Sequence, residues 1–145
     1  MTFAMSPTER ETFLAGVHVG VISVDDPGHG PLNVPVWYAY EPGGTVDVVT
    51  ARDSLKGRRL RAAGRFSLCA QNENPPYAYV SVEGPIAEIV DPATPEVRRA
   101  MAYRYLGQEF GDLYLAATEE DAPDQVMVRL SPERWRTTDY AKQYG

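Results

Sequence analysis

Apolar and polar residues alternate along much of the chain, which is the pattern of strands with one buried face. The alternation predicts strands at residues 17–24, 32–40, 45–50, 66–71, 77–84 with a continuation to residue 90, and 126–130 with a continuation towards Trp135. Residues typical of turns, such as Gly, Pro, Asn and Asp, separate most of these segments. Closely spaced strands joined by turns favour a barrel or sandwich over alternating strand and helix units.

Helices are predicted where the alternation stops and capping residues appear. Ser6–Glu9 has the composition of a capping box with proline at the first helical position, and this helix is expected to end near Gly16. A second strong helix start lies at residues 94–96, and we expect that helix to end at Gly107. Residues 109–118 predict a further helix, followed by an acidic loop.

The segment 50–65 is the most basic part of the chain. It follows the strand 45–50 and predicts a short helix that ends at Gly64. Two hydroxyls, at Thr50 and Ser54, precede Lys56 at this strand-to-helix corner, and a helix start offers free backbone N–H groups. We interpret the corner as an anion-binding site, whereas Arg61 and Arg65 are interpreted as surface charge.

Pro35 interrupts the strand 32–40, because proline cannot donate a hydrogen bond to a neighbouring strand. Two explanations remain open from the residues alone. The strand lies at an edge of the sheet, or it is bulged where another group packs against its backbone.

Composition excludes several classes of function. The 145 residues are 43% apolar and 23% charged, which is typical of one soluble domain spanning residues 1–145. The net charge of −6 argues against binding to nucleic acid or to an anionic membrane surface, and no apolar run is long enough to cross a membrane. The single cysteine, Cys69, fits a reducing compartment, so we expect a cytoplasmic protein.

The residues do not indicate a metal site or a protein nucleophile. No zinc-ligand spacing, phosphate-binding glycine loop or nucleophile elbow is present. We interpret His18 and His29 as structural or solvated, Cys69 as part of the core, and the acidic residues 119–124 as a solvated loop.

The order of these motifs resembles the pyridoxamine 5′-phosphate oxidase-like superfamily, and within it the flavin- and deazaflavin-dependent oxidoreductases. The resemblance is carried by the segments 31–38, 50–60, 65–68 and 77–84. It implies a mainly β fold, a six-stranded antiparallel split β-barrel with short flanking helices. It also implies a homodimer, with the cofactor in a groove at the interface.

The same resemblance implies roles for individual residues. The backbone of Asn33, Val34, Pro35, Val36 and Trp37 would lie along the cofactor ring. Thr50, Ser54 and Lys56 would hold the phosphate of the cofactor tail, with Arg58 and Arg59 close by. Tyr79 takes the position at which the oxidases carry a glutamine facing the ring.

Departures from the oxidase pattern guide the choice of cofactor. Asn33, Tyr38 and Leu55 stand where the oxidases have basic residues, which favours the deazaflavin coenzyme F420 over FMN. We therefore expect hydride transfer between F420 and a small conjugated substrate, with Tyr79 or solvent as the proton donor. The alternatives are an FMN-binding oxidase or reductase and a non-catalytic protein that binds the cofactor or haem.

Overall fold

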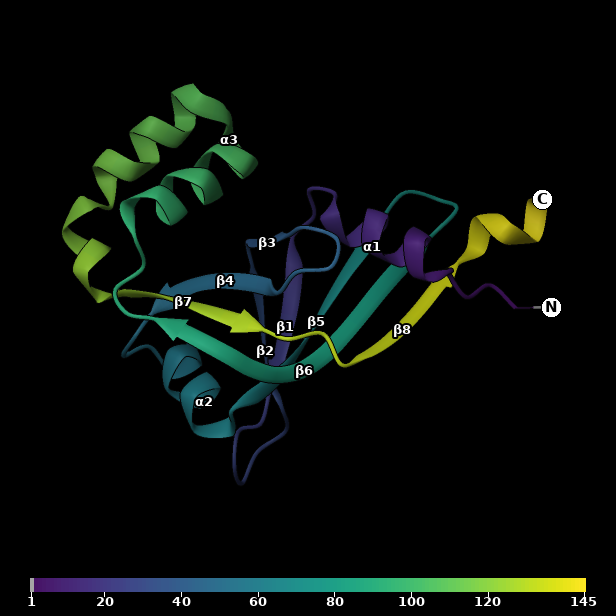
Figure 1. Ribbon diagram of the computed structural model, residues 1–145, viewed down its shortest axis with the longest axis horizontal. Helices are drawn as coiled ribbons and strands as arrows, with labels where there is room; N and C mark the ends of the chain where they lie inside the picture. Colours follow the sequence, from purple (N-terminus) through teal and green to yellow (C-terminus); the bar gives the residue numbers. More distant parts are fainter. Residues whose placement is uncertain (1) are drawn as a thin grey trace.

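A computed structural model describes residues 2–145 and contains one curled antiparallel sheet with helices on its flanks (Figure 1). The sheet order is β2-β1-β5-β6-β7-β4-β3, and β8 pairs with β6 outside this path. The strands are β1 (Gly20–Val24), β2 (Leu32–Val36), β3 (Tyr38–Tyr40), β4 (Val46–Ala51), β5 (Arg65–Asn72), β6 (Ala78–Val90), β7 (Gln125–Leu130) and β8 (Arg134–Asp139). The mainly β fold with short flanking helices is confirmed.

The structure has eight strands where six were expected, because two of the expected strands are interrupted. The strand 32–40 breaks at Trp37, so that β2 pairs with β1 whereas β3 pairs with β4. The last strand breaks at 131–133, so that β7 pairs with the second half of β6 and β8 pairs with the first half. Each break lets one chain segment serve two parts of the curled sheet.

The helices begin and end close to the predicted residues. They are α1 (Pro7–Ala15), α2 (Leu55–Ala63) and α3 (Pro95–Ala117), with short 3-10 helices η1 (Glu119–Asp124) and η2 (Tyr140–Tyr144). The capping box at the start of α1 is present, and Gly64 ends α2 in the left-handed conformation. Gly107 has φ 77° inside α3 and folds this helix into a hairpin (Figure 1).

The core lies inside the curl of the sheet. It contains the inward side chains of every strand from β1 to β7, joined by Leu14 of α1 and Leu60 of α2. Tyr38 is fully buried there, and its hydroxyl donates a hydrogen bond to the Leu14 carbonyl at 2.7 Å. As the alternation predicted, Val17, Val19 and Val21 point outward from β1 and the segment before it, while Ile22 is buried.

Among residues 2–145, no helix is both long and apolar enough to span a membrane.

Candidate functional site

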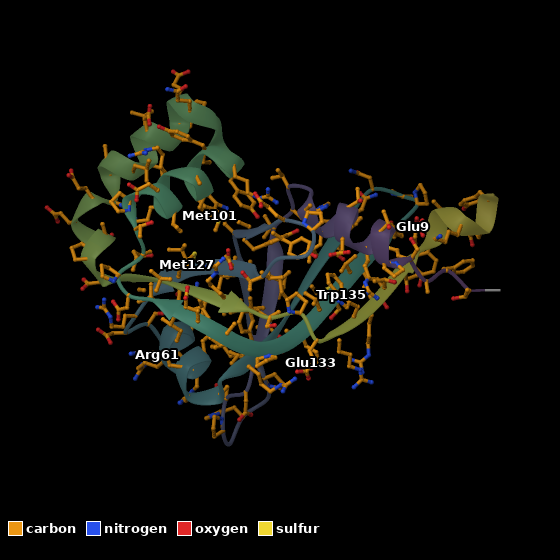
Figure 2. The ribbon with its side chains drawn as sticks, in the orientation of Figure 1. Glu9, Arg61, Met101, Met127, Glu133 and Trp135 are labelled. Carbon is orange, nitrogen blue, oxygen red and sulfur yellow. The ribbon has the colours of Figure 1, made fainter. Side chains whose placement is uncertain are left out.

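A cavity of about 400 Å³ lies between the hairpin of α3 and the sheet. We call it the central cavity. Its floor and walls come from the break between β2 and β3, from β4, from the first turn of α2 and from α3. It is lined by Val19, Pro35, Val36, Trp37, Val49, Lys56, Arg98, Met101, Ala102, Tyr114, Thr118, Asp121 and Gln125. Met101 projects from α3 on the side that faces the strands (Figure 2).

A second hollow of about 530 Å³ adjoins the central cavity, and we call it the side cavity. The two share the side chains of Val49, Lys56, Tyr114 and Gln125. The side cavity is lined in addition by Leu32, Val34, Thr50, Ala51, Ser54 and Leu55. Together the two cavities form an elongated site with Lys56 at its junction.

This site brings together seven of the residues singled out in the sequence. The ring-contact candidates Pro35, Val36 and Trp37 line the central cavity. Val34 and the hydroxyl residues Thr50 and Ser54 line the side cavity, and Lys56 lines both. Pro35 lies on β2, which is an edge strand, so the edge-strand explanation for this proline holds. Pro35 also lines the central cavity, but β2 pairs with β1 without a register shift, so the strand is not bulged there.

Four candidates lie outside both cavities. Asn33 is exposed on β2, Arg58 is exposed on α2, and Tyr79 is partly exposed on β6 between Gln71 and Thr138. The Arg59 guanidinium pairs with the Asp26 carboxylate at 2.8 Å. Within this chain, Arg59 therefore fastens α2 to the turn after β1, and neither Arg58 nor Arg59 lines the two cavities.

The Ser54 hydroxyl is committed to the helix start. It accepts a hydrogen bond from the Gly57 N–H at 3.0 Å and donates one to the Ala51 carbonyl at 2.8 Å. Its single proton is thereby used, so Ser54 has none left to donate to an anion. Ser54 shapes the corner as the N-cap of α2, which leaves Thr50, Lys56 and the first N–H groups of the helix as the candidates for binding an anion.

Among residues 2–145, Thr50 is the one buried residue with a hydroxyl group besides tyrosine, at 3% exposure. Its hydroxyl lies 3.5 Å from the Ser54 hydroxyl, at the limit of a hydrogen bond. A buried hydroxyl with such a weak partner has hydrogen-bonding capacity to offer a ligand.

Lys56 is the cation at the centre of the site. Burial lowers the pKa of its ammonium group, and no carboxylate among residues 2–145 offsets this effect. Desolvation without an opposite charge disfavours the charged form of a lysine, and an anionic ligand would reverse that penalty. The geometry therefore favours an anion beside Lys56.

Trp37 forms the aromatic wall of the central cavity and is held by α3. Its ring stacks on Tyr105 at 5.0 Å with an angle of 6°, and Tyr114 packs against it at 5.3 Å. The Tyr38 N–H donates to the Tyr105 hydroxyl at 2.9 Å, and the same hydroxyl lies 2.7 Å from the His18 carbonyl. Tyr105 thus satisfies backbone groups that the strand break leaves without a partner in the sheet.

The sequence did not predict the contribution of the first arm of α3 to the site. Arg98, Met101 and Ala102 line the central cavity from this arm, and Tyr114 lines it from the second arm. Local signals predict that a helix forms here, but they do not show which strands the helix covers.

Removing the hydroxyl in Tyr105→Phe should destabilise the fold by about 1–2 kcal/mol, because the buried Tyr38 N–H loses its acceptor. The variant should also shift the fluorescence of Trp37, whose stacking partner is no longer anchored. Urea unfolding and tryptophan emission measure the two effects. Tyr103→Phe is the control, because the Tyr103 hydroxyl bonds Asp112 at an exposed position of the same hairpin. Equal losses of stability in Tyr105→Phe and Tyr103→Phe would contradict the anchoring role of the Tyr105 hydroxyl.

Solved structures with the same fold support this architecture. A conserved hypothetical protein, Rv2991 from Mycobacterium tuberculosis, superposes with a TM-score of 0.77 at 25% identity, over 99% of this chain and 90% of that one. A structure described as an F420 reductase gives a TM-score of 0.64 at 18% identity, over 87% of this chain and 94% of the other. An FAD and haem binding protein from Mycobacterium smegmatis gives 0.71 at 14% identity, over 94% of this chain and 72% of the other.

These similarities confirm the split-barrel fold. None of the curated proteins matches the chain in sequence. The family model described as pyridoxamine 5'-phosphate oxidase matches residues 6–139, which is nearly the whole chain. The protein therefore belongs to the pyridoxamine 5'-phosphate oxidase family.

Proposed function

We propose that this protein is an oxidoreductase that binds coenzyme F420 and uses it to exchange hydride with a small conjugated substrate. The observation that carries the proposal is the half-buried ammonium of Lys56, which has no carboxylate partner among residues 2–145 and stands where the two cavities meet. Such a cation is stabilised by an anionic ligand that reaches the same point.

The walls on either side of Lys56 suit a flat coenzyme with a phosphate-bearing tail. On one side, Val36 and Trp37 supply apolar and aromatic surface for a planar ring. On the other side, Thr50 and the start of α2 supply donors for a phosphate. The solved structures described as an F420 reductase and as an FAD and haem binding protein have the same fold, which supports a flavin-type coenzyme.

The chain itself is proposed to bind, orient and shield the reacting groups. The coenzyme supplies the hydride-transfer chemistry when it is bound. Trp37 and Tyr114 exclude water from the central cavity, and Lys56 fixes the anionic end of the ligand. Tyr79 does not line either cavity of its own chain. The proton donated to the substrate is therefore proposed to come from solvent or from Tyr79 of a second copy.

We propose a homodimer as the functional form. Val17, Val19 and Val21 expose 59%, 56% and 40% of their surface, and Tyr77 and Tyr79 are exposed at the end of β6. Grouped apolar side chains on one sheet face are typical of a protein interface. Covering this face with a second copy would bury the valines. A monomeric mass in light scattering would contradict this part of the proposal.

The test is a fluorescence or calorimetric titration of the purified protein with F420 and, separately, with FMN. We expect tighter binding of F420, and we expect Lys56→Ala to weaken it about 10–100-fold, the equivalent of losing a charged hydrogen bond. Arg58→Ala is the control, because Arg58 is exposed and lies outside both cavities.

Three results would decide between the candidates. Tighter binding of FMN would replace F420 in the proposal with FMN. An unchanged affinity in Lys56→Ala would remove Lys56 from the site. A bound, reduced coenzyme that no electron acceptor reoxidises would indicate sequestration rather than catalysis.

A further inference from the structure

A second cation lines the central cavity at its α3 end. Arg98 lies near the start of α3, and its Nη2 donates hydrogen bonds to the Thr118 hydroxyl at 3.0 Å and to the Thr118 carbonyl at 3.4 Å. The Thr118 hydroxyl in turn donates to the Tyr114 carbonyl at 2.8 Å. The hairpin thus holds the guanidinium against the cavity from both of its arms.

Arg98 differs from most arginines of this acidic chain in having no carboxylate partner. Arg52 pairs with Asp91, Arg59 with Asp26, Arg65 with Glu133 and Arg129 with Asp47. Arg98 forms no ion pair with any residue from 2 to 145 and uses only Nη2 in the hydrogen bonds described. A guanidinium has five N–H donors, so Nε and Nη1 still have donors to offer a ligand.

The balance of charge in the cavity is positive. Lys56 and Arg98 line it together with one acid, Asp121, which is exposed and forms no ion pair with either cation. Two buried apolar residues of the same helix, Met101 and Ala102, also line the cavity. A ligand that fits this end has an apolar body and an anionic group.

The two cations serve different ends of the site. Thr50 and Ser54 line only the side cavity, Arg98 and Thr118 line only the central cavity, and Lys56 lines both. The phosphate of the proposed coenzyme has its donors at the Thr50 end. Arg98 is therefore available to bind a second anionic group. A guanidinium matches a carboxylate, because its parallel N–H groups reach both oxygens.

We propose that the central cavity takes a substrate with a planar unsaturated body and a carboxylate, and that Arg98 binds the carboxylate. This inference rests on the proposed function, since it assigns the coenzyme phosphate to the other end of the site. Met101 and Ala102, on the same helix as Arg98, would contact the planar body, beside the coenzyme ring proposed to lie on Val36 and Trp37. Arg98 then determines specificity, by selecting substrates that carry a carboxylate over neutral ones of the same shape.

The probes are trans-cinnamate, a planar unsaturated carboxylate, and its neutral amide, each titrated against the full-length protein alone and loaded with F420. We expect cinnamate to bind about tenfold more tightly than the amide. Arg98→Gln, which removes the charge but keeps a polar side chain, should abolish this preference and leave the affinity for F420 within about twofold. Arg99→Gln is the control, because Arg99 is exposed on the same helix and does not line the cavity.

Each outcome bears on the inference separately from the proposed function. Equal binding of cinnamate and its amide by the unmodified protein would overturn it, as would a preference that survives in Arg98→Gln. A loss of F420 affinity in Arg98→Gln without a change for cinnamate would assign Arg98 to the glutamyl tail of the coenzyme and also overturn it. Failure to bind F420, with the preference for cinnamate intact and dependent on Arg98, would reject the coenzyme while the carboxylate site stands.

Discussion

Gly84→Ala should destabilise the protein by about 4 kcal/mol or more, which is close to abolishing the fold of a typical domain. A Cβ atom at this position would lie 1.8 Å from the Ser131 carbonyl oxygen and 3.2 Å from the Glu133 nitrogen. Both are backbone atoms, so no side-chain rotation relieves the clash. The strand β6 and the segment 131–133 would have to separate.

That separation would break the bonds that let the sheet curl at this point. The Ser131 N–H donates to the Pro85 carbonyl at 2.9 Å, and the Glu133 N–H donates to the Glu83 carbonyl at 2.9 Å. These bonds flank the point where the pairing partner of β6 changes from β8 to β7. Close approach of the two backbones here requires glycine.

Urea unfolding followed by circular dichroism measures the effect. Gly30→Ala is the matched control, since an added Cβ there meets no atom within 4 Å, and it should change the free energy of unfolding by less than about 0.5 kcal/mol. A Gly84→Ala protein as stable as the control would show that β6 and the 131–133 segment are not in close contact.

The sequence predicted the elements of the fold better than their interruptions. Alternation and capping are local signals, so the start of α1, the end of α2 at Gly64 and the turn at Gly107 were all found. The breaks at Trp37 and at 131–133 depend on which strand each half pairs with. Such pairing joins residues far apart in the chain and leaves no periodic pattern.

The candidate site was predicted only in part, because local patterns do not show which distant segments meet. Thr50, Ser54 and Lys56 are close in sequence, so a single strand-to-helix corner brings them together. Arg58 and Arg59 follow at once, but the helical turn carries Arg59 away from the cavity to Asp26. The opposite wall includes the first arm of α3, about forty residues further on, and no local pattern shows that this arm lies over the corner.

Gly57→Ala should cause the second-largest loss of stability, although alanine has a higher helix propensity than glycine. In an exposed helix interior, alanine is more favourable than glycine by about 1 kcal/mol. At Gly57, however, a Cβ atom would lie 2.3 Å from the Ala51 carbonyl oxygen and 2.7 Å from the Arg52 carbonyl oxygen. We expect a net loss of about 2–3 kcal/mol, because the first turn of α2 must move away from the end of β4.

The same displacement should weaken coenzyme binding. Gly57 donates its N–H to the Ser54 hydroxyl and follows Lys56 directly, so moving this turn shifts the ammonium relative to Thr50. Paired measurements of urea unfolding and F420 titration separate the two effects. Ala62→Gly is the control: Ala62 is exposed on the same helix, and this variant should lose about 1 kcal/mol of stability with its F420 affinity unchanged. A Gly57→Ala protein that is more stable than the unmodified chain would mean that propensity outweighs the contact with β4, and that Lys56 is not held in place by the close packing of α2.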